Sequence, residues 1–230
     1  MIKKQILWEI SKKEVPYPQA LTHMEHLVRE IHAQQTPERV WLLEHPPLYT
    51  AGTSAQQEDL FNPAEYPTYL AGRGGQWTYH GPGQRIAYVM LDLSHSHGIV
   101  PPKDVRAYVH ALEQWIIKTL AVFDIHGEIR DGRVGVWVVD PHTGREEKIA
   151  AIGVRVSRWV SWHGVAINVH PRLSDFEGIV PCGLREYGVT SLHKLGLSLN
   201  MAELDKALIA VWSTIFGSTP HLCDFHLPLS

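Results

Sequence analysis

Residues 124–170 constrain the possible folds of this 230-residue chain more than any other segment. Short runs rich in β-branched and aromatic residues alternate there with three turn sequences: Asp131-Gly132, residues 140–144 and residues 162–164. Short strands separated by such turns are typical of consecutive β-hairpins. We therefore expect this segment to form a run of antiparallel strands.

Three further segments carry apolar residues at the three- and four-residue spacing of amphipathic helices. They are residues 17–36, 103–123 and about 201–216. Pro37 ends the first segment, and Pro101 and Pro102 stand just before the second. Asn200 is a candidate N-cap of the third, and Gly217 is its stop signal. The sequence therefore predicts three helices.

Three apolar segments predict further strands: residues 3–10, 39–45 and 85–93. Residues 45–54 contain two adjacent prolines and are expected to form a loop. With 44% hydrophobic residues and no internal repeat or linker, the chain can bury the core of one domain, residues 1–230. The elements predict an α+β (mixed α/β) fold, in which a mixed, mostly antiparallel sheet has its helices packed on one face.

The charge balance and the hydrophobic pattern argue against several classes of partner. The formal net charge is −3 and like charges form no block, so we expect no nucleic-acid binding. The first ten residues lack the hydrophobic segment of a secretory signal, and no later segment approaches the roughly 20 apolar residues of a spanning helix. We expect a cytoplasmic protein without membrane contact, and a monomer.

Two cysteines are too few for a disulfide framework, so their surroundings matter more than their number. Cys182 stands between a proline and a glycine, where we expect an exposed loop. A thiol acts as a nucleophile only as the thiolate, so a nearby cation or base must lower its pKa. Cys223, close to the last residue, is expected to have no catalytic function.

Lys148 is one candidate for this partner, because it enters a strand just before a run of apolar and small residues. Partial burial lowers the pKa of a lysine, which then either takes the thiol proton or holds the thiolate as an ion pair. His80 and His163, each next to a glycine, are alternatives as the base of a Cys-His pair or as turn-stabilising residues. Sequence spacing does not decide between these partners.

Two other motifs carry weaker chemical signals. His95 and His97 share one side of an extended chain, but two ligands without further spaced ligands do not make a zinc pattern, so we expect no metal. The glycine-rich segment 72–84 matches neither phosphate-binding template. It does place Arg73 and Thr78 beside backbone amides, which suits the binding of an acyl carbonyl or a neutral chain.

Residues 73–84, 148–169 and 181–192 together closely resemble the lipoyl(octanoyl) transferases of the biotin and lipoate protein ligase superfamily, in both order and spacing. The resemblance covers about residues 40–192. It implies a biotin/lipoate ligase-like catalytic domain with a core of about residues 40–217. Two positions depart from the family pattern: Trp77 is bulkier than the usual valine or isoleucine, and residues 93–98 lack the basic residues often found there.

The resemblance implies that Cys182 is the acyl-thioester nucleophile and that Lys148 lowers its pKa. It implies a substrate-binding wall supported by His163, in which glycines let the backbone lie against an eight-carbon chain. The wall consists of Arg73, Gly74, Gly75, Gln76, Trp77, Thr78, Tyr79, His80, Ala151, Ile152, Gly153, Gly164, Val165 and Ala166. Backbone amides near Cys182 and the small residues after Lys148 are our hypothesis for the oxyanion site.

The implied reaction is the first step of lipoate biosynthesis, a protein lipoylation pathway. An octanoyl group moves from octanoyl-acyl carrier protein to the lysine of a lipoyl domain, in the glycine cleavage H protein or the E2 subunit of 2-oxoacid dehydrogenases. No cofactor, metal or nucleotide is implied, because one thioester replaces another. Two alternatives remain open: an ATP-dependent lipoate or biotin ligase, which needs no cysteine nucleophile, and a noncatalytic module that binds lipoyl domains or acyl carrier protein.

Overall fold

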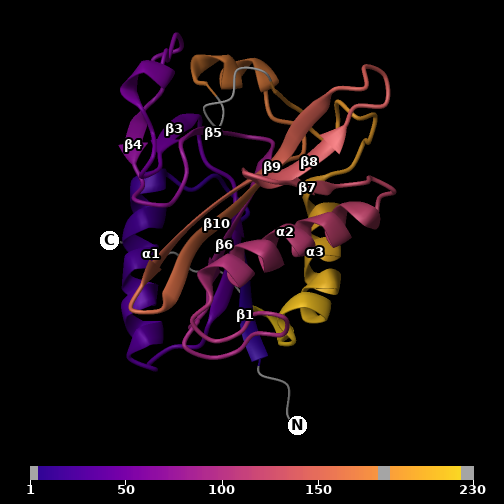
Figure 1. Ribbon diagram of the computed structural model, residues 1–230. Coiled ribbons are helices and arrows are strands. Elements are labelled where there is room, and N and C mark those ends of the chain that lie inside the picture. Colours follow the sequence, from indigo (N-terminus) through magenta and orange to yellow (C-terminus); the bar gives the residue numbers. More distant parts are fainter. Residues whose placement is uncertain (1–4, 181–186, 224–230) are drawn as a thin grey trace.

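The computed structural model describes residues 5–180 and 187–223. Within these residues, the main sheet contains nine strands (Figure 1). Eight follow one another in the order β12 (Thr219–Cys223), β1 (Gln5–Ile10), β2 (Arg39–Leu43), β6 (Gln84–Met90), β10 (Val160–Asn168), β9 (Glu146–Ser157), β8 (Arg133–Val139) and β7 (Glu128–Arg130). The ninth, β11 (Gly188–Val189), pairs with β9.

The main sheet is mixed, as predicted. β12, β1 and β2 run parallel to one another, whereas every pairing from β2 through β7 is antiparallel. The antiparallel part includes the segment 124–170, which the sequence predicted to form hairpins. The short β11 adds a parallel pairing to β9.

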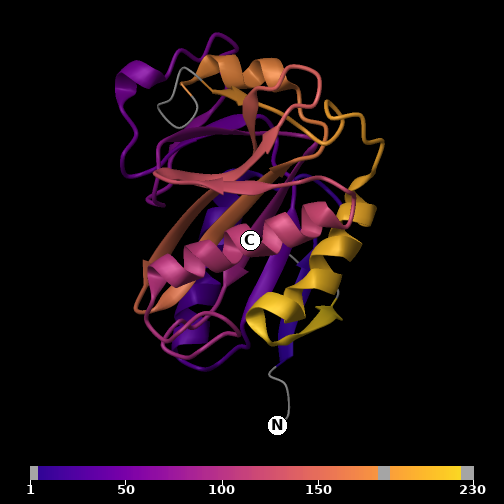
Figure 2. The same ribbon diagram turned by 45° about the vertical axis from the view of Figure 1, so that its right-hand side comes forward.

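Helices cover both faces of the main sheet, whereas the sequence pattern predicted one face. Along β2, Trp41 and Leu43 pack with α1 (Tyr17–His32), while Val40 and Leu42 pack with α2 (Val105–Ala121) and α3 (Met201–Phe216). Figure 2 shows α2 and α3 together in front of the sheet. Strands buried on both faces carry a continuous apolar run rather than an alternating one, so the sequence pattern does not show how many faces are covered.

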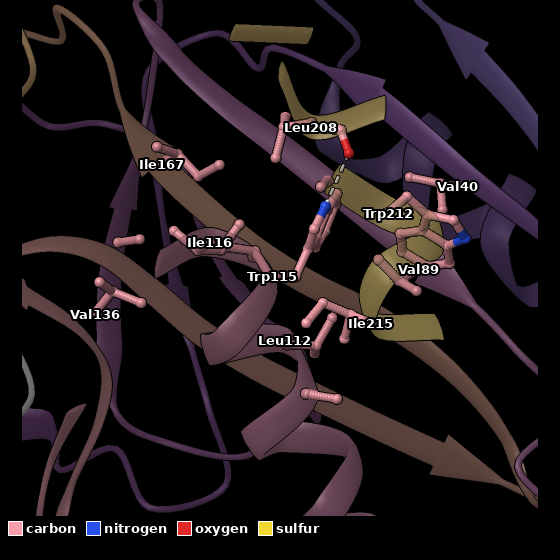
Figure 3. Close-up of a cluster of buried hydrophobic side chains, with 14 of the residues drawn as sticks. Val40, Val89, Leu112, Trp115, Ile116, Val136, Ile167, Leu208, Trp212 and Ile215 are labelled. Carbon is pink, nitrogen blue, oxygen red and sulfur yellow. Dashed lines mark hydrogen bonds between the residues drawn. The ribbon is translucent and has the colours of Figure 1, made fainter. Parts of the chain in front are cut away.

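Three tryptophans form the centre of the core beneath α2 and α3. Trp8 of β1, Trp115 of α2 and Trp212 of α3 meet edge to face, with ring centroids between 5.1 and 6.0 Å apart. The Trp115 indole N–H donates to the Leu208 carbonyl at 3.0 Å, so it is buried with a partner (Figure 3). This packing fixes both helices against the sheet.

The third helix begins and ends where the sequence predicted. Asn200 caps its first turn, and the Glu203 side chain accepts in return from the Asn200 amide, which completes a capping box. The helix stops at Gly217. α2 is capped in a similar way by the side chain of Asp104, which accepts from the Ala107 amide at 2.9 Å.

A smaller three-stranded sheet lies beside the main one. It consists of β3 (Leu48–Ala51), β4 (Thr68–Leu70) and β5 (Trp77–His80), with β3 in the middle. The 3₁₀ turns η1 (Gln57–Asp59) and η2 (Leu173–Gly178) flank its core of tyrosines and Phe176. The prediction of a loop over residues 45–54 is therefore wrong for β3, because Pro46 and Pro47 precede this strand and take no part in its ladder.

One predicted turn lies elsewhere in the structure. Residues 162–164 lie inside β10, and the chain reverses instead at Arg158 and Trp159, both with positive φ. His163 also has a positive φ, of 61°, so this point in the strand is distorted. The glycine after His163 therefore marks an irregularity within a strand rather than a turn.

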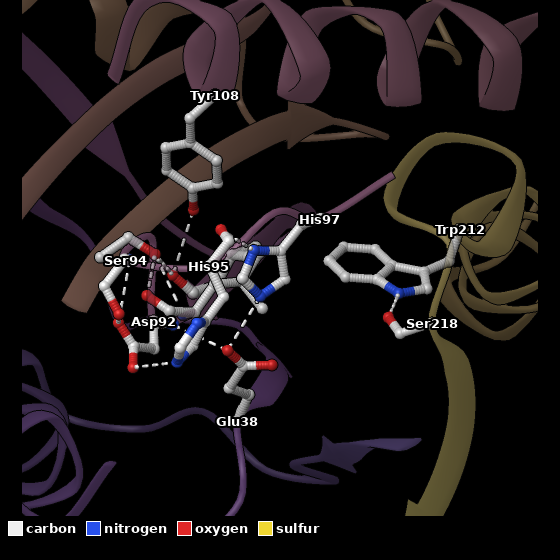
Figure 4. A network of polar contacts seen from close by, with 11 residues as sticks. Glu38, Asp92, Ser94, His95, His97, Tyr108, Trp212 and Ser218 are labelled. Carbon is white, nitrogen blue, oxygen red and sulfur yellow. Dashed lines mark hydrogen bonds and ion pairs between the residues drawn. The ribbon is translucent and has the colours of Figure 1, made fainter. Parts of the chain in front are cut away.

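His95 and His97, the two histidines considered as metal ligands, lie in the loop after β6, and each contacts a carboxylate. His97 lies 2.8 Å from Glu38 and 3.1 Å from the His95 carbonyl, and exposed His95 lies 3.6 Å from Asp92 (Figure 4). The His97 contact joins the loop to the residue before β2, whereas the His95 contact lies within the loop. Within the described ranges, no group of three or more His, Cys, Asp or Glu side chains is arranged to hold a metal. Nor does any helix there have the length and apolar character needed to cross a membrane.

Candidate active site

A cavity of about 270 Å³ lies between the small sheet and strands β6, β9 and β10 of the main sheet. Its size is close to the lower limit of small-molecule sites, about 300 Å³. Fourteen of the predicted site residues line it: Arg73, Gly75, Gln76, Trp77, Thr78, His80, Lys148, Ala151, Ile152, Gly153, His163, Gly164, Val165 and Ala166. Three sequence segments that are far apart thus meet around one space.

Two residues assigned to the wall do not line the cavity. The Tyr79 side chain packs into the core of the small sheet, with its ring centroid 5.2 Å from that of Phe176. Alternate residues of a strand face opposite sides, so Thr78 and His80 line the cavity and Tyr79 does not. The Gly74 amide donates to the Val154 carbonyl at 2.9 Å, which ties the glycine-rich loop to β9.

Trp77 lines the cavity and also packs into the core of the small sheet. The indole N–H donates to the Gln56 carbonyl at 2.7 Å, and the ring packs into the core of the small sheet. The Trp77 ring is therefore held by both a hydrogen bond and apolar packing.

Lys148 lies at the edge of the cavity that β8 closes. Its side chain is 6% exposed, and Nζ donates to the Val134 carbonyl at 2.7 Å. Nζ also lies 4.9 Å from the centroid of the Trp137 ring on the paired strand, within the range of a cation–π contact. The Lys148 side chain is therefore held in place beside the cavity.

Cys182 lies outside the described residues, which resume at Tyr187. The chain then forms β11, in which Gly188 pairs with Glu147 and Val189 pairs with Lys148. The described chain thus resumes, a few residues after Cys182 in the sequence, beside Lys148. The other cysteine, Cys223, is half-buried on β12, and its thiol donates to the Trp8 carbonyl at 3.4 Å.

Arg73 organises the glycine-rich loop. Nη2 donates to the carbonyl and hydroxyl oxygens of Thr50, each at 2.9 Å, and to the Gln76 carbonyl at 3.1 Å. Nη1 donates to the Gly74 carbonyl at 2.9 Å. These bonds join β3 to the loop that enters β5, so a buried guanidinium holds the cavity wall together.

A chain of hydrogen bonds fixes the protonation of His80. The Asn168 amide donates to the Thr190 carbonyl, and its oxygen accepts from Gln84 Nε2 at 3.0 Å. Gln84 Oε1 must therefore accept from His80 Nδ1, 2.7 Å away, which leaves His80 Nε2 to accept from the Thr50 hydroxyl. Burial lowers the pKa of His80 well below its ordinary value, so His80 is a neutral wall residue.

His45, a residue behind the wall, is also neutral. Its Nδ1 faces the Val15 carbonyl at 2.5 Å, so Nε2 accepts from the Tyr88 hydroxyl at 2.7 Å. Burial lowers its pKa to about 4. The hydrogen bond holds Tyr88, which lines the cavity.

The irregular point in β10 brings His163 to the cavity. The following glycine, Gly164, lies so close to β6 that a Cβ there would be 2.3 Å from the Ala87 carbonyl oxygen. Burial lowers the pKa of His163 to about 3, so its imidazole is neutral. Within the described residues, His163 Nε2 and the Tyr17 hydroxyl, both in residues that line the cavity, have no hydrogen-bond partner.

Sequence reasoning missed twelve lining residues: Tyr17, Thr50, Ser54, Gln84, Ile86, Tyr88, Gly132, Arg133, Val134, Asn168, Phe176 and Val189. Gln84, Ile86 and Tyr88 alternate along β6, so the period-2 pattern of that strand could have indicated them once its cavity face was known. Tyr17 carries no such signal, because it reaches the cavity from the first turn of a helix.

Comparison with known proteins identifies the family of this chain. The model of the lipoyl protein ligase A/B catalytic domain family matches residues 16–213. The octanoyltransferase of Gluconacetobacter diazotrophicus is 64% identical over 96% of this chain and 95% of its own. That of Paramagnetospirillum magneticum is 59% identical over 92% of this chain and 97% of its own.

Among solved structures, a lipoate-protein ligase A bound with ATP has a TM-score of 0.74 and 14% identity, covering 98% of this chain and 90% of its own. At this identity the likeness shows the shared fold alone. The family and the much closer relatives agree with the sequence motifs: this chain is a transferase that belongs to the lipoyl protein ligase A/B catalytic domain family and, within it, to the octanoyltransferases.

Proposed function

We propose that this protein moves an octanoyl group from octanoyl-acyl carrier protein to a lysine of a lipoyl domain, through a thioester on Cys182. The observation that carries the proposal is the position of Lys148, a buried amine beside a cavity lined with small and neutral residues. The pairing of Val189 with Lys148 supports it, because Val189 follows Cys182 by only seven positions in the sequence.

In the first half-reaction, Lys148 accepts the Cys182 thiol proton and the thiolate attacks the donor thioester carbonyl. A new C–S bond forms to Cys182, and the C–S bond to the phosphopantetheine group breaks. The departing thiolate takes the proton back from Lys148. One thioester replaces another, so the step needs no nucleotide.

In the second half-reaction, the neutral amine of the lipoyl-domain lysine attacks the Cys182 thioester. An amide bond forms, and Lys148 passes the proton lost by the amine to the departing Cys182 thiolate. The enzyme returns to its starting state. Backbone amides beside Cys182 and the small residues that follow Lys148 are the proposed donors to the oxyanion in both steps.

The cavity suits an octanoyl chain because its polar side chains are neutral or already bonded. His80 and His163 are uncharged, and the Arg73 guanidinium donates to the surrounding loop. An apolar chain that binds there therefore does not have to desolvate a charged imidazole. The proposed acceptors are the glycine cleavage H protein and the E2 lipoyl domains, and the proposed donor is octanoyl-acyl carrier protein.

The test is intact-protein mass spectrometry after mixing with octanoyl-acyl carrier protein. Wild-type protein should gain a hydroxylamine-labile octanoyl adduct, and Cys182→Ser should not. Cys223→Ser is the matched control and should acylate like the wild type, because this thiol lies on β12, outside the cavity. An adduct of equal yield on Cys182→Ser would contradict the proposal, and modification that requires ATP and free octanoate would indicate a ligase instead.

A further inference from the structure

Glu113 is a buried carboxylate with no part in the reaction proposed above. It lies on α2, is 5% exposed, and faces β8 and β9 rather than solvent. A carboxylate this deeply buried is costly unless it is bonded. Its contacts therefore indicate what it does.

The Glu113 carboxylate binds the backbone of β8 at an irregular point. Oε1 accepts from the Gly135 amide at 3.1 Å. Gly135 has a φ of +122°, a conformation unfavourable to residues with a side chain, and the β8–β9 register shifts immediately after it, between Val136 and Trp137. A Cβ on Gly135 would lie 2.6 Å from the Ala150 carbonyl oxygen, so β8 approaches β9 closely there.

The backbone carbonyl that accepts a hydrogen bond from Lys148 lies at this irregular point. The peptide unit that donates its N–H to Glu113 joins Val134 to Gly135, and its carbonyl oxygen accepts from Lys148 Nζ at 2.7 Å. One peptide plane thus contacts the Glu113 carboxylate on one side and Lys148 Nζ on the other. Because a peptide unit is planar, fixing its N–H also fixes its C=O.

We propose that Glu113 is a positioning residue, which holds the Val134–Gly135 peptide so that its carbonyl keeps Lys148 Nζ in place beside the cavity. The inference rests on the proposed function, since it assigns a purpose to the position of Lys148. It adds a residue of α2, outside the cavity lining, to the parts on which the activation of Cys182 depends.

The charges around Glu113 agree with this geometry. Burial raises the pKa of Glu113, and the Gly135 hydrogen bond, His110 and Lys148 each act against that rise. His110, on the same helix and exposed, lies 3.8 Å from Oε2, while Lys148 comes from β9. Glu147, the neighbour of Lys148 on β9, is bonded to Lys194 at 2.7 Å.

The test is the pH profile of Cys182 alkylation by iodoacetamide, with Cys182 and Cys223 followed separately by peptide mass spectrometry. Glu113→Leu removes the acceptor, so the profile should shift to higher pH and alkylation at neutral pH should fall roughly tenfold. Glu113→Gln keeps an oxygen that accepts from Gly135 and should stay within about threefold of the wild type. Cys223 should react equally in all variants.

Asp205→Asn is the matched control, because Asp205 is a second buried carboxylate under the same face of the sheet and lies outside the cavity lining. It should leave the Cys182 profile unchanged. Two results would overturn the proposal: a folded Glu113→Leu variant whose profile coincides with that of the wild type, or a Glu113→Gln variant that shifts as much as Glu113→Leu.

If Glu113→Leu does not fold, Glu113→Asp takes its place. Aspartate keeps the charge but is one methylene too short to reach Gly135, so the same shift is expected, and an unchanged profile would overturn the proposal. Lys148→Ala, measured in parallel, separates the two hypotheses. A profile unaffected by Lys148→Ala refutes the activation of Cys182 by Lys148, whereas a profile moved by Lys148→Ala but not by Glu113→Leu refutes only the positioning by Glu113.

Discussion

Two helices cover the same face of the sheet, and each buries one carboxylate, but the two carboxylates have different partners. Asp205 of α3 contacts the Arg85 guanidinium through two atom pairs, at 2.9 and 3.0 Å. Glu113 of α2 forms no direct ion pair with an arginine or lysine among the described residues, and its carboxylate accepts from the Gly135 amide instead. Burial raises the pKa of both groups. Asp205 thus joins α3 to β6 through an ion pair, whereas Glu113 fixes the backbone of β8 beside the cavity.

The largest expected effect comes from breaking the ion pair. Arg85→Leu leaves the Asp205 carboxylate buried without its partner and should lower the free energy of unfolding by about 3–5 kcal/mol. Chemical denaturation measures this. The double variant Arg85→Leu/Asp205→Leu should recover most of the loss, since it removes both charges. A double variant as unstable as the single one would show that the pair does not explain the instability.

The second effect is a difference in pH dependence. Burial raises the pKa of Asp205 to about 6, despite the Arg85 guanidinium. The folded state therefore holds the proton more tightly than the unfolded state, and this contribution to stability is present below the unfolded pKa and lost as the pH rises through about 6. Between about pH 4 and pH 7, the wild type should lose about 3 kcal/mol relative to Asp205→Asn.

Denaturation midpoints of the two proteins across this range measure the difference. The constant cost of leaving Arg85 without a carboxylate cancels, because only the slope is compared. Parallel slopes would mean that Asp205 titrates alike in the folded and unfolded states, which would contradict this prediction.

Gly135→Ala probes the partner of Glu113 and should have a smaller effect on stability. The new Cβ meets the Ala150 carbonyl oxygen in a backbone region that alanine disfavours, so a loss of about 1–3 kcal/mol is expected. Thermal unfolding measures the loss. Acylation of Cys182 should fall as well, since the same peptide holds Lys148. Gly144→Ala is the control and should affect acylation much less, because Gly144 also has a positive φ but lies outside the cavity lining with open space around its Cβ.

The smallest effect concerns the two helices alone. Asn200→Ala and Asp104→Ala each remove an N-cap, of α3 and α2 respectively, and should cost about 1 kcal/mol in the free energy of unfolding. Neither cap lies in the cavity lining, so octanoyl transfer by the folded protein should not change. If the Asp104→Ala variant stays folded but loses octanoyl transfer, then α2 as a whole, rather than Glu113, sets the position of Lys148.

Local signals predicted much of the fold. The third helix could be located to the residue, because Asn200 and Gly217 act on their own neighbours. Motif-bearing segments also predicted most of the cavity. The prediction of a turn at residues 162–164 was wrong. The glycine after the histidine suggested a turn, but Gly164 instead allows β10 to approach β6 closely. The real turn uses Arg158 and Trp159, which carry no turn signal.

Tertiary contacts could not be predicted in the same way. Glu113 lies within a helical segment whose spacing says nothing of Gly135, and Tyr17 reaches the cavity only because α1 packs on the second face of the sheet. The number of covered faces was itself hidden, because strands buried on both sides lose their alternation. Such facts depend on how elements meet, and no single segment encodes them.

Within the described residues, the Tyr17 hydroxyl and His163 Nε2 have no hydrogen-bond partner and are already out of reach of solvent. Their desolvation, at roughly 1–3 kcal/mol apiece, is therefore a cost of folding and not of binding. A hydrocarbon tail in the cavity adds nothing to this cost. The two atoms thus lower the stability of the folded protein without penalising the length of the fatty group.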